Sequence, residues 1–261
     1  EQKNGMYAIN FEINQDGELV QEGTAFISPD GKQLFLSAPL DLTEALPEPT
    51  TQTQEYAKND KPVIDLFIMS HCPYGTQEEK AILPVINKLG DKVDFNVRFV
   101  YYAMHGETEI KEELNQYCIQ KEQNNKYLNY LSCFLDAGNG TACLIEAEIN
   151  TQELENCVAQ ADEDFAVTAN FEDESSWLSG TYPLVNLDVE LNEAYGVGGS
   201  PTLVINGITV NAQRNPASIM DAVCNSFTEA PSECSEEVST ETPTAGFGYS
   251  GTASTDSGSC S

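Results

Sequence analysis

The stretch VIDLFIMSHCPYG, residues 63–75, decides the fold that we expect for this chain. Residues 63–68 are apolar and β-branched apart from one acid, which predicts a buried strand. Pro73 suits the first turn of a helix, and apolar residues then recur at helical spacing up to Gly90. The stretch therefore predicts a strand followed by a helix whose N-terminus is capped by Cys72.

A helix N-terminus is a place where a cysteine becomes reactive. Unpaired backbone N–H groups and the positive end of the helix dipole favour a thiolate over a thiol. A cysteine with an ordinary pKa of about 8.5 is only a few per cent ionised at pH 7, whereas one with a pKa of about 6 is about 90% ionised. Cys72 is therefore a candidate nucleophile, and the alternative is a buried or disulfide-locked cysteine.

A second segment, YGVGGSPTLVING at residues 195–207, supports the same fold. Its apolar end predicts a strand over residues 202–205, and Asn206-Gly207 is the preferred two-residue turn of a β-hairpin. The other expected elements are a strand over residues 93–101, a helical insertion over 108–185, the second hairpin strand over 208–210 and a closing helix over 216–227. This order predicts an α/β chain with a thioredoxin-like fold that carries an inserted helical subdomain.

Cys-Pro-Tyr-Gly after a strand, together with Gly-Val-Gly-Gly-Ser-Pro-Thr at residues 196–202, resembles the DsbA-like branch of thioredoxin-fold proteins. The resemblance implies a cis peptide bond before Pro201, which would face Cys72. It implies that Ser200 offers backbone hydrogen bonds to a substrate strand and that Tyr74 lies at the rim of the site. It further implies thiol–disulfide exchange on extracytoplasmic protein thiols or disulfides, with Cys72 as the nucleophile.

The chain departs from that family at the active-site motif, because Gly75 stands where the second cysteine would be. Without that thiol, a mixed disulfide is not released by the usual intramolecular attack, although a monothiol still isomerises disulfides through the substrate's own thiol. The family's histidine lies at the position of Tyr74, so His71 is only a candidate for stabilising the thiolate. Asp65 lies one residue from the position of the family's buried acid, and a structural role is the alternative.

The later cysteines also look similar to those of gamma-interferon-inducible lysosomal thiol reductases. The residues that carry this likeness are Cys157, Cys224 and Cys234. The Cys-Gln-His-Gly signature of that family is absent here. The two resemblances together cover about residues 62–234.

The chain has eight cysteines and two histidines, and no cysteine pair has CxxC spacing. This pattern favours disulfides and an oxidising compartment over a metal site, so we expect a secreted or cell-surface protein without metal or cofactor. Three preferred pairs leave Cys72 and Cys260 over. Cys260 reaches back to Cys72 and resolves its mixed disulfide, crosslinks to another chain, or stays free. The preferred pairs are Cys118 with Cys157, Cys133 with Cys143 and Cys224 with Cys234.

The composition is strongly acidic, with 42 Asp and Glu against 12 Lys and Arg and a net charge of −30. Such a charge disfavours nucleic acid and anionic membrane as partners. No stretch is apolar enough to predict a transmembrane segment. The first residue is Glu1, and we expect a mature chain whose signal segment has been removed.

Outside the thioredoxin-like domain, at residues 62–228, the sequence predicts three further segments. Residues 1–46 predict a small antiparallel β-meander, which would pack on another part or form a homo-oligomer because such a sheet is marginal alone. Residues 47–61 predict a linker, and residues 229–261 predict a disordered or tethering tail rich in Ser, Thr and Gly.

Two functions follow from these observations. The first is a thiol–disulfide oxidoreductase or isomerase of the monothiol type that acts through Cys72. The alternative is a non-catalytic extracellular structural, filament or adhesion subunit on a degenerate thioredoxin fold, assembled through the N-terminal strands or Cys260.

Overall fold

The computed structural model describes residues 2–3, 6–15, 18–35 and 55–249 of the 261-residue chain. The chain divides into two compact units, Glu1–Thr53 and Gln54–Ser261. The expected linker at residues 47–61 lies outside the described residues up to residue 54, and the site at Cys72 lies in the second unit.

The N-terminal unit is an antiparallel sheet in the order β1-β2-β3-β4. The long strands β2 and β3 pair along most of their length, with a register shift between Ile13 and Asn14. An antiparallel meander was predicted from the sequence, and it is confirmed. The strands are β1 (Gln2–Lys3), β2 (Met6–Gln15), β3 (Glu18–Ile27) and β4 (Leu34–Phe35).

The second unit has a four-stranded mixed sheet in the order β6-β5-β7-β8. The two central strands, β5 and β7, are antiparallel, and β6 pairs in parallel with β5. This arrangement, with the helix α1 (Pro73–Leu89) between β5 and β6, is the thioredoxin fold that the sequence predicts. The strands are β5 (Val63–Ile68), β6 (Asp94–Phe99), β7 (Thr202–Ile205) and β8 (Ile208–Val210).

The turn between β7 and β8 has the residues that its geometry requires. Asn206 and Gly207 both have positive φ angles, 51° and 80°, as a two-residue hairpin turn of the primed type demands. The Asn206 side chain also fixes the start of β5, because its Oδ1 accepts a hydrogen bond of 2.9 Å from Val63 N. The turn therefore sets the register that brings the loop before β7 next to the end of β5.

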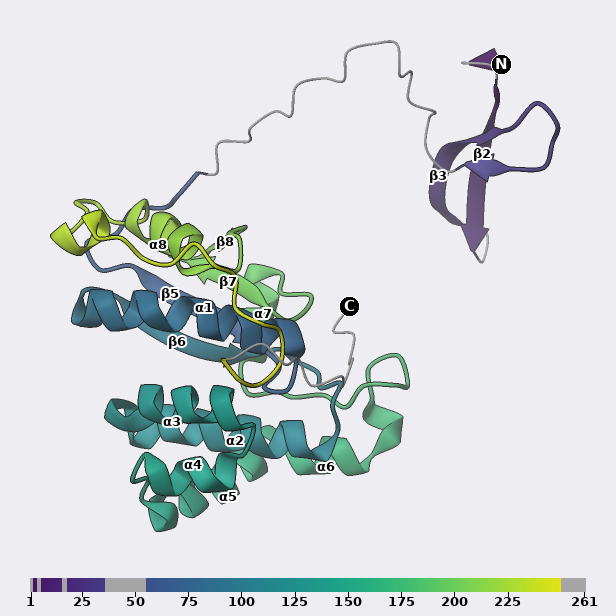
Figure 1. Ribbon diagram of the computed structural model, residues 1–261. Coiled ribbons are helices and arrows are strands. Elements are labelled where there is room, and N and C mark those ends of the chain that lie inside the picture. Colours follow the sequence, from purple (N-terminus) through teal and green to yellow (C-terminus); the bar gives the residue numbers. More distant parts are fainter. Residues whose placement is uncertain (1, 4–5, 16–17, 36–54, 250–261) are drawn as a thin grey trace. The chain divides into compact units, whose positions relative to one another are not determined.

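Helices cover the sheet in two groups. Figure 1 shows α2 to α6 stacked as a layer below α1, with α8 above it. The insertion consists of α2 (Glu107–Glu122), α3 (Asn124–Ala137), α4 (Gly140–Glu146), α5 (Thr151–Phe165) and α6 (Val167–Glu172). The other helices are α7 (Val189–Tyr195), α8 (Pro216–Cys224) and short 3₁₀ turns at Gly90–Lys92, Glu174–Ser176 and Ser232–Ser235.

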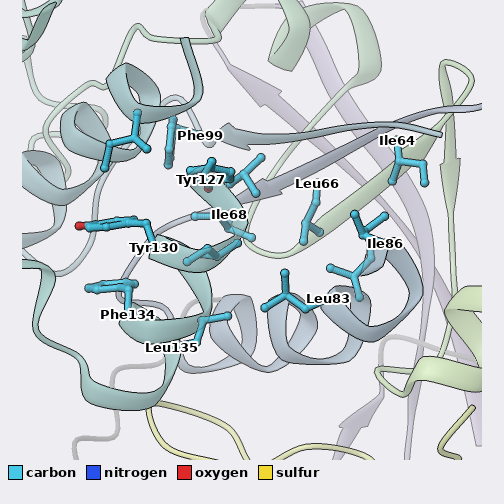
Figure 2. Close-up of a cluster of buried hydrophobic side chains, with 14 of the residues drawn as sticks. Ile64, Leu66, Ile68, Leu83, Ile86, Phe99, Tyr127, Tyr130, Phe134 and Leu135 are labelled. Carbon is cyan, nitrogen blue, oxygen red and sulfur yellow. The ribbon is translucent and has the colours of Figure 1, made fainter. Parts of the chain in front are cut away.

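One hydrophobic core joins the sheet, α1 and the insertion. Figure 2 shows side chains of β5, α1 and α3 in a single cluster, and each labelled residue is at most 5% exposed. Because α1 is buried against both the sheet and α3, the insertion is continuous with the core rather than a separate domain. The labelled residues are Ile64, Leu66, Ile68, Leu83, Ile86, Phe99, Tyr127, Tyr130, Phe134 and Leu135.

Three disulfides join neighbouring elements, and they are the three pairs preferred from the sequence. Cys118–Cys157 links α2 to α5, Cys133–Cys143 links α3 to α4, and Cys224–Cys234 links α8 to the 3₁₀ turn that follows it. Two of the three therefore hold the helical insertion together.

Residues 236–249 continue from that turn and lie along α1 (yellow in Figure 1), where the Gln77 side chain donates a hydrogen bond of 2.7 Å to Pro243 O. We call this segment the C-terminal strap. The expectation of a disordered tail therefore does not hold for these residues. The composition misleads because much of the strap is held through backbone groups, such as Pro243 O and the N–H groups of Gly246 and Gly248, which give no hydrophobic pattern.

Removal of each disulfide of the insertion should lower the free energy of unfolding, by an amount that grows with the logarithm of the length of the loop that it closes. In the chain-entropy model, Cys118→Ala with Cys157→Ala costs about 4 kcal/mol, and Cys133→Ala with Cys143→Ala costs about 3 kcal/mol. The sequence separations are 39 and 10 residues. Urea unfolding at pH 7 measures both, and a larger loss for the shorter loop would contradict the expectation.

Candidate functional site

Cys72 caps the N-terminus of α1, as the sequence predicts. Its backbone is extended, with φ −66° and ψ 123°, and Gly75 N donates a hydrogen bond of 3.4 Å to Cys72 Sγ. The Cys72 backbone is also fixed, because its N–H donates to Met69 O at 3.0 Å and its carbonyl accepts from Thr76 N at 2.9 Å. The sulfur therefore lies at the positive end of a 17-residue helix and accepts one of its free N–H groups.

Cys72 is fully buried and disulfide-bonded. The other three disulfides use six of the eight cysteines of the sequence. The one cysteine that remains is Cys260, which lies outside the described residues. The Cys72 sulfur is thus in its oxidised state in this structure.

The loop before β7 lies against the Cys72 sulfur. The peptide bond between Ser200 and Pro201 is cis, and the carbonyl oxygen of Ser200 is 3.6 Å from Cys72 Sγ. The Ser200 hydroxyl oxygen accepts a hydrogen bond of 2.9 Å from Met69 N, which joins this loop to the end of β5. The structure therefore brings Cys72, Ser200 and Pro201 together in one site.

Gly75 occupies a position where a side chain would displace the Ser200 hydroxyl. A Cβ atom built there would lie 2.7 Å from Ser200 Oγ and 3.1 Å from Met69 O. Both distances are shorter than ordinary van der Waals contacts, and the first atom cannot move without losing its hydrogen bond to Met69 N. The place of the second cysteine is therefore filled by Ser200 and not vacant.

Tyr74 lies at the rim of the site and is 48% exposed. The Arg214 guanidinium carbon is 5.0 Å from the centre of the Tyr74 ring, and Arg214 Nε is 3.7 Å from Glu78 Oε2. Burial raises the pKa of Glu78 to about 7, against the opposing effect of the Arg214 charge. Glu78 and Arg214 line a small pocket beside Pro201, so this rim carries a charge that changes near neutral pH.

The His71 ring lies in an aromatic cluster. Its centre is 5.7 Å from the Phe134 ring and 5.6 Å from the Phe247 ring, and its Nδ1 is 3.0 Å from Ser70 Oγ. Burial lowers the pKa of His71, with the Glu109 charge acting in the opposite direction. The ring is therefore mainly neutral at pH 7, which is a physical reason against the thiolate-stabilising charge that was considered for it.

Buried glutamates of α2 hold the loop that leads to Cys72. Glu113 Oε1 accepts a hydrogen bond of 3.2 Å from Ser70 N, and Glu109 Oε2 accepts one of 3.4 Å from His71 N. Glu109 Oε1 also accepts from Met104 N at 2.7 Å. Burial raises the pKa of Glu113 well above its usual range, and the Glu109 charge adds to this effect.

Two further acids, Glu79 of α1 and Glu112 of α2, are buried behind this loop. Glu79 is fully buried, no hydrogen-bond partner is found for its carboxyl oxygens, and burial raises its pKa well above the usual range. Glu112 accepts hydrogen bonds of 2.9 and 3.0 Å from the Tyr130 hydroxyl and one of 2.8 Å from Gln116, and burial raises its pKa to about 7. The interior beside the site therefore holds carboxyl groups that keep their protons near neutral pH.

Asp65 has a structural partner. Its Oδ1 accepts a hydrogen bond of 2.9 Å from Arg98 Nε, and Arg98 also reaches Asp188 at 3.4 Å. The ion pair joins β5 to β6, and it favours the structural alternative that the sequence left open for Asp65.

The sequence reasoning missed Lys80, Arg214 and the buried glutamates. The sequence carried a signal for two of the buried glutamates, Glu78 and Glu79. They precede Ile82 by four and three residues, so they extend the apolar face of α1 toward Cys72. Acidic side chains at such positions are buried when the apolar face of the helix is buried. For Lys80 and Arg214 we find no comparable signal.

No ion or membrane segment is indicated in the part of the chain that the structure describes. Among these residues, no group of three or more His, Cys, Asp and Glu side chains is arranged to hold a metal ion. No helix among them is long and apolar enough to cross a membrane.

Comparison with solved structures shows similarity to DsbA-type thioredoxin-like oxidoreductases at low identity. Oxidised DsbA of Mycobacterium tuberculosis is 16% identical, with a TM-score of 0.46, over 73% of this chain and 92% of that chain. Oxidised BdbD of Bacillus subtilis is 17% identical (TM-score 0.44; 64% and 89%). MdbA, a thiol-disulfide oxidoreductase of Actinomyces oris, is 16% identical (TM-score 0.44; 66% and 83%).

No family model and no curated protein matches the sequence. All three TM-scores are below 0.5, so nothing about this chain is argued from the likeness. The class that the chain's own topology defines is a thioredoxin-like fold with a helical insertion, and its function has to be inferred from the Cys72 site.

The close approach at Gly75 predicts a non-additive pair of substitutions. Gly75→Ala should lower the free energy of unfolding by about 1–3 kcal/mol, because the new methyl group displaces Ser200 Oγ from Met69 N. In a Ser200→Ala background the same change should cost about 1 kcal/mol less. Urea unfolding of the four proteins gives the coupling, and Gly198→Ala, which points into open space, is the control. Additive losses would contradict this packing.

The buried carboxyl groups predict that stability falls as the pH rises. The pKa of Glu112 is about 7 in the folded protein and 4.5 ordinarily, so between these values the folded protein keeps a proton that the unfolded chain releases. The free energy of unfolding therefore decreases with rising pH across this window. Glu112→Gln should make the slope shallower by up to about 1.4 kcal/mol per pH unit.

Urea unfolding between pH 4.5 and 7 measures this slope. Glu107→Gln, at an exposed position of the same helix, is the control and should leave the slope unchanged. An unchanged slope in Glu112→Gln would show that this carboxyl group is already ionised in the folded protein.

Proposed function

We propose that this protein is a thiol–disulfide oxidoreductase or isomerase whose reactive atom is Cys72 Sγ. One observation carries the proposal: an oxidised sulfur lies at the N-cap of α1, 3.6 Å from the carbonyl before Pro201. A purely structural disulfide requires neither a helix N-terminus nor the loop before β7 beside its sulfur.

The local electrostatics favour exchange at this sulfur. The Gly75 N–H group and the helix dipole stabilise a negative charge on Cys72 Sγ, whereas the nearby Ser200 carbonyl opposes it. Stabilisation of the thiolate increases the ionised fraction of Cys72 and makes its sulfur a better leaving group. A disulfide made by Cys72 is therefore readily broken by an incoming thiolate. We expect the helix N-terminus to dominate because its N–H group donates directly to the sulfur.

The substrate class that fits is protein thiols or disulfides in an oxidising, extracytoplasmic compartment. Three further disulfides within the described residues support that compartment, since such bonds do not persist in a reducing cytosol. The substrate would dock along Ser200 and Pro201, with Tyr74 and Arg214 at the rim. The exposed Tyr74 ring, stacked by Arg214, offers a flat apolar surface beside the sulfur.

The proposal is tested by the reactivity of Cys72 in the full-length protein after mild reduction. Iodoacetamide at pH 7 should modify Cys72 at least about tenfold faster than it modifies the thiol of glutathione, because a thiolate is the reacting species. Peptide mass spectrometry measures the rate at Cys72, and insulin reduction measures turnover. Cys72→Ser is the control and should lose turnover.

The contrary result is equally clear. If reduced Cys72 reacts no faster than glutathione and Cys72→Ser reduces insulin as well as the unsubstituted protein does, the site is not catalytic. The alternative of a non-catalytic structural subunit would then be the better description.

A further inference from the structure

The C-terminal strap, residues 236–249, is built into the protein through a buried lysine of α1. Lys80 is only 2% exposed. Its Nζ donates hydrogen bonds to Gly246 O and Gly248 O, both at 2.8 Å, and to Thr244 Oγ1 at 3.2 Å. An ammonium group has three N–H donors, so these strap oxygens satisfy all of them. A buried lysine without such acceptors is costly, and α1 therefore depends on the strap being in place.

The strap runs to the N-terminus of α1, where Cys72 lies. Gly246 N donates a hydrogen bond of 3.0 Å to the carbonyl of Pro73, the residue that follows Cys72. Gly248 N donates one of 2.9 Å to Leu135 O of α3. These bonds place the end of the described strap directly beside the reactive cysteine.

An aromatic contact fixes the same end of the strap. The Phe247 ring is 5.1 Å from the Phe134 ring and 5.6 Å from the His71 ring, both in edge-to-face geometry. A Cβ atom at Gly138 would lie 2.9 Å from the Phe247 ring, so the end of α3 has room for this ring only because residue 138 is glycine. The strap is therefore a docked element whose Phe247 ring packs against His71, Phe134 and Gly138.

Cys260 is the one cysteine that the other bridges leave for Cys72. Cys72 is disulfide-bonded, position 75 cannot hold a thiol without displacing Ser200, and the three remaining bridges use all other cysteines. Eleven residues lead from Tyr249 to Cys260 and can span up to about 36–40 Å. The strap that they continue contacts Pro73, the neighbour of Cys72, through Gly246 N. A tether of this length gives an effective thiol concentration of the order of millimolar.

We propose that the strap delivers Cys260 to Cys72, so that Cys260 is the resolving thiol that the active-site motif lacks. This inference rests on the proposed function. Lys80 and Phe247 hold the strap through contacts that involve no disulfide, so the strap itself stays docked beside Cys72 after the bond is reduced.

The exchange balances with these two sulfurs. The Cys72 thiolate attacks a substrate disulfide, a Cys72–substrate disulfide forms, and the first substrate sulfur leaves as a thiolate. The Cys260 thiolate then attacks Cys72 Sγ and the second substrate sulfur leaves as a thiolate. The substrate gains two electrons, and the Cys72 and Cys260 thiols lose two on forming their disulfide. In the reverse direction a substrate dithiol reduces that disulfide.

The experiment uses oxidised glutathione and the full-length protein after mild reduction that leaves the three other disulfides intact. In the unsubstituted protein, two molecules of reduced glutathione should be released per protein, and glutathionylated Cys72 should be short-lived. In Cys260→Ser, one should be released, and the Cys72 adduct should persist at least tenfold longer. Peptide mapping of the native protein should find Cys72 joined to Cys260.

Two variants test the strap itself. Phe247→Ala and Lys80→Met should each slow the loss of the Cys72 adduct at least threefold, because the tether is no longer docked beside Cys72. Lys111→Met, at an exposed lysine that pairs with Glu107 on α2, is the matched control and should behave as the unsubstituted protein does. Phe247→Ala changes a strap residue, so it serves if Lys80→Met fails to fold.

The outcomes separate this inference from the proposed function. Equal adduct lifetimes in the unsubstituted protein and in Cys260→Ser overturn the resolving role, while Cys72 remains reactive. Undiminished resolution in both strap variants overturns delivery by the strap. If Cys72 in Cys260→Ser forms no adduct with oxidised glutathione, the proposed function fails instead.

Discussion

The structure of the site depends on the close contact between the N-terminus of α1 and the loop before β7. Gly75, Ser200 and Met69 approach so closely that an additional atom at position 75 would displace the Ser200 hydroxyl from its hydrogen bond to Met69 N. This contact fixes Cys72 at the helix cap and sets the Ser200 carbonyl against its sulfur. A second cysteine at position 75 would disturb this contact, and since the sequence has Gly75 there, a resolving thiol has to come from elsewhere in the chain or from another molecule.

Charge is distributed unevenly between the surface and the interior. A net charge of −30 suggests that the acids are solvated, yet Glu79, Glu109 and Glu113 are buried beside α1 and the loop that leads to Cys72. These carboxyl groups act differently: Glu109 and Glu113 bind backbone N–H groups, whereas Glu79 lacks a hydrogen-bond partner. Glu113 belongs to both descriptions, because it accepts a backbone hydrogen bond and burial raises its pKa well above the usual range, as it does for Glu79.

Much of the fold could be predicted because its signals are local. The apolar run over residues 63–68, Pro73 and the Asn206-Gly207 turn each act within a few residues, and close cysteine spacings favoured the observed pairs. The strap and Lys80 could not be predicted, because their contacts join residues more than 160 positions apart, mostly through backbone carbonyls. The surroundings of His71 depend on the same contacts, since Phe247 comes from the strap.

The strap also has a consequence for cooperativity. The Cys224–Cys234 bridge fixes its beginning to α8, while its end binds α1 through Lys80 and α3 through Leu135. The strap thereby connects α1, α3 and α8, which come from different parts of the sequence of this unit. Local opening of the insertion or of α8 has to break strap contacts as well, so these parts gain a shared unfolding transition that packing of neighbouring helices alone would not ensure.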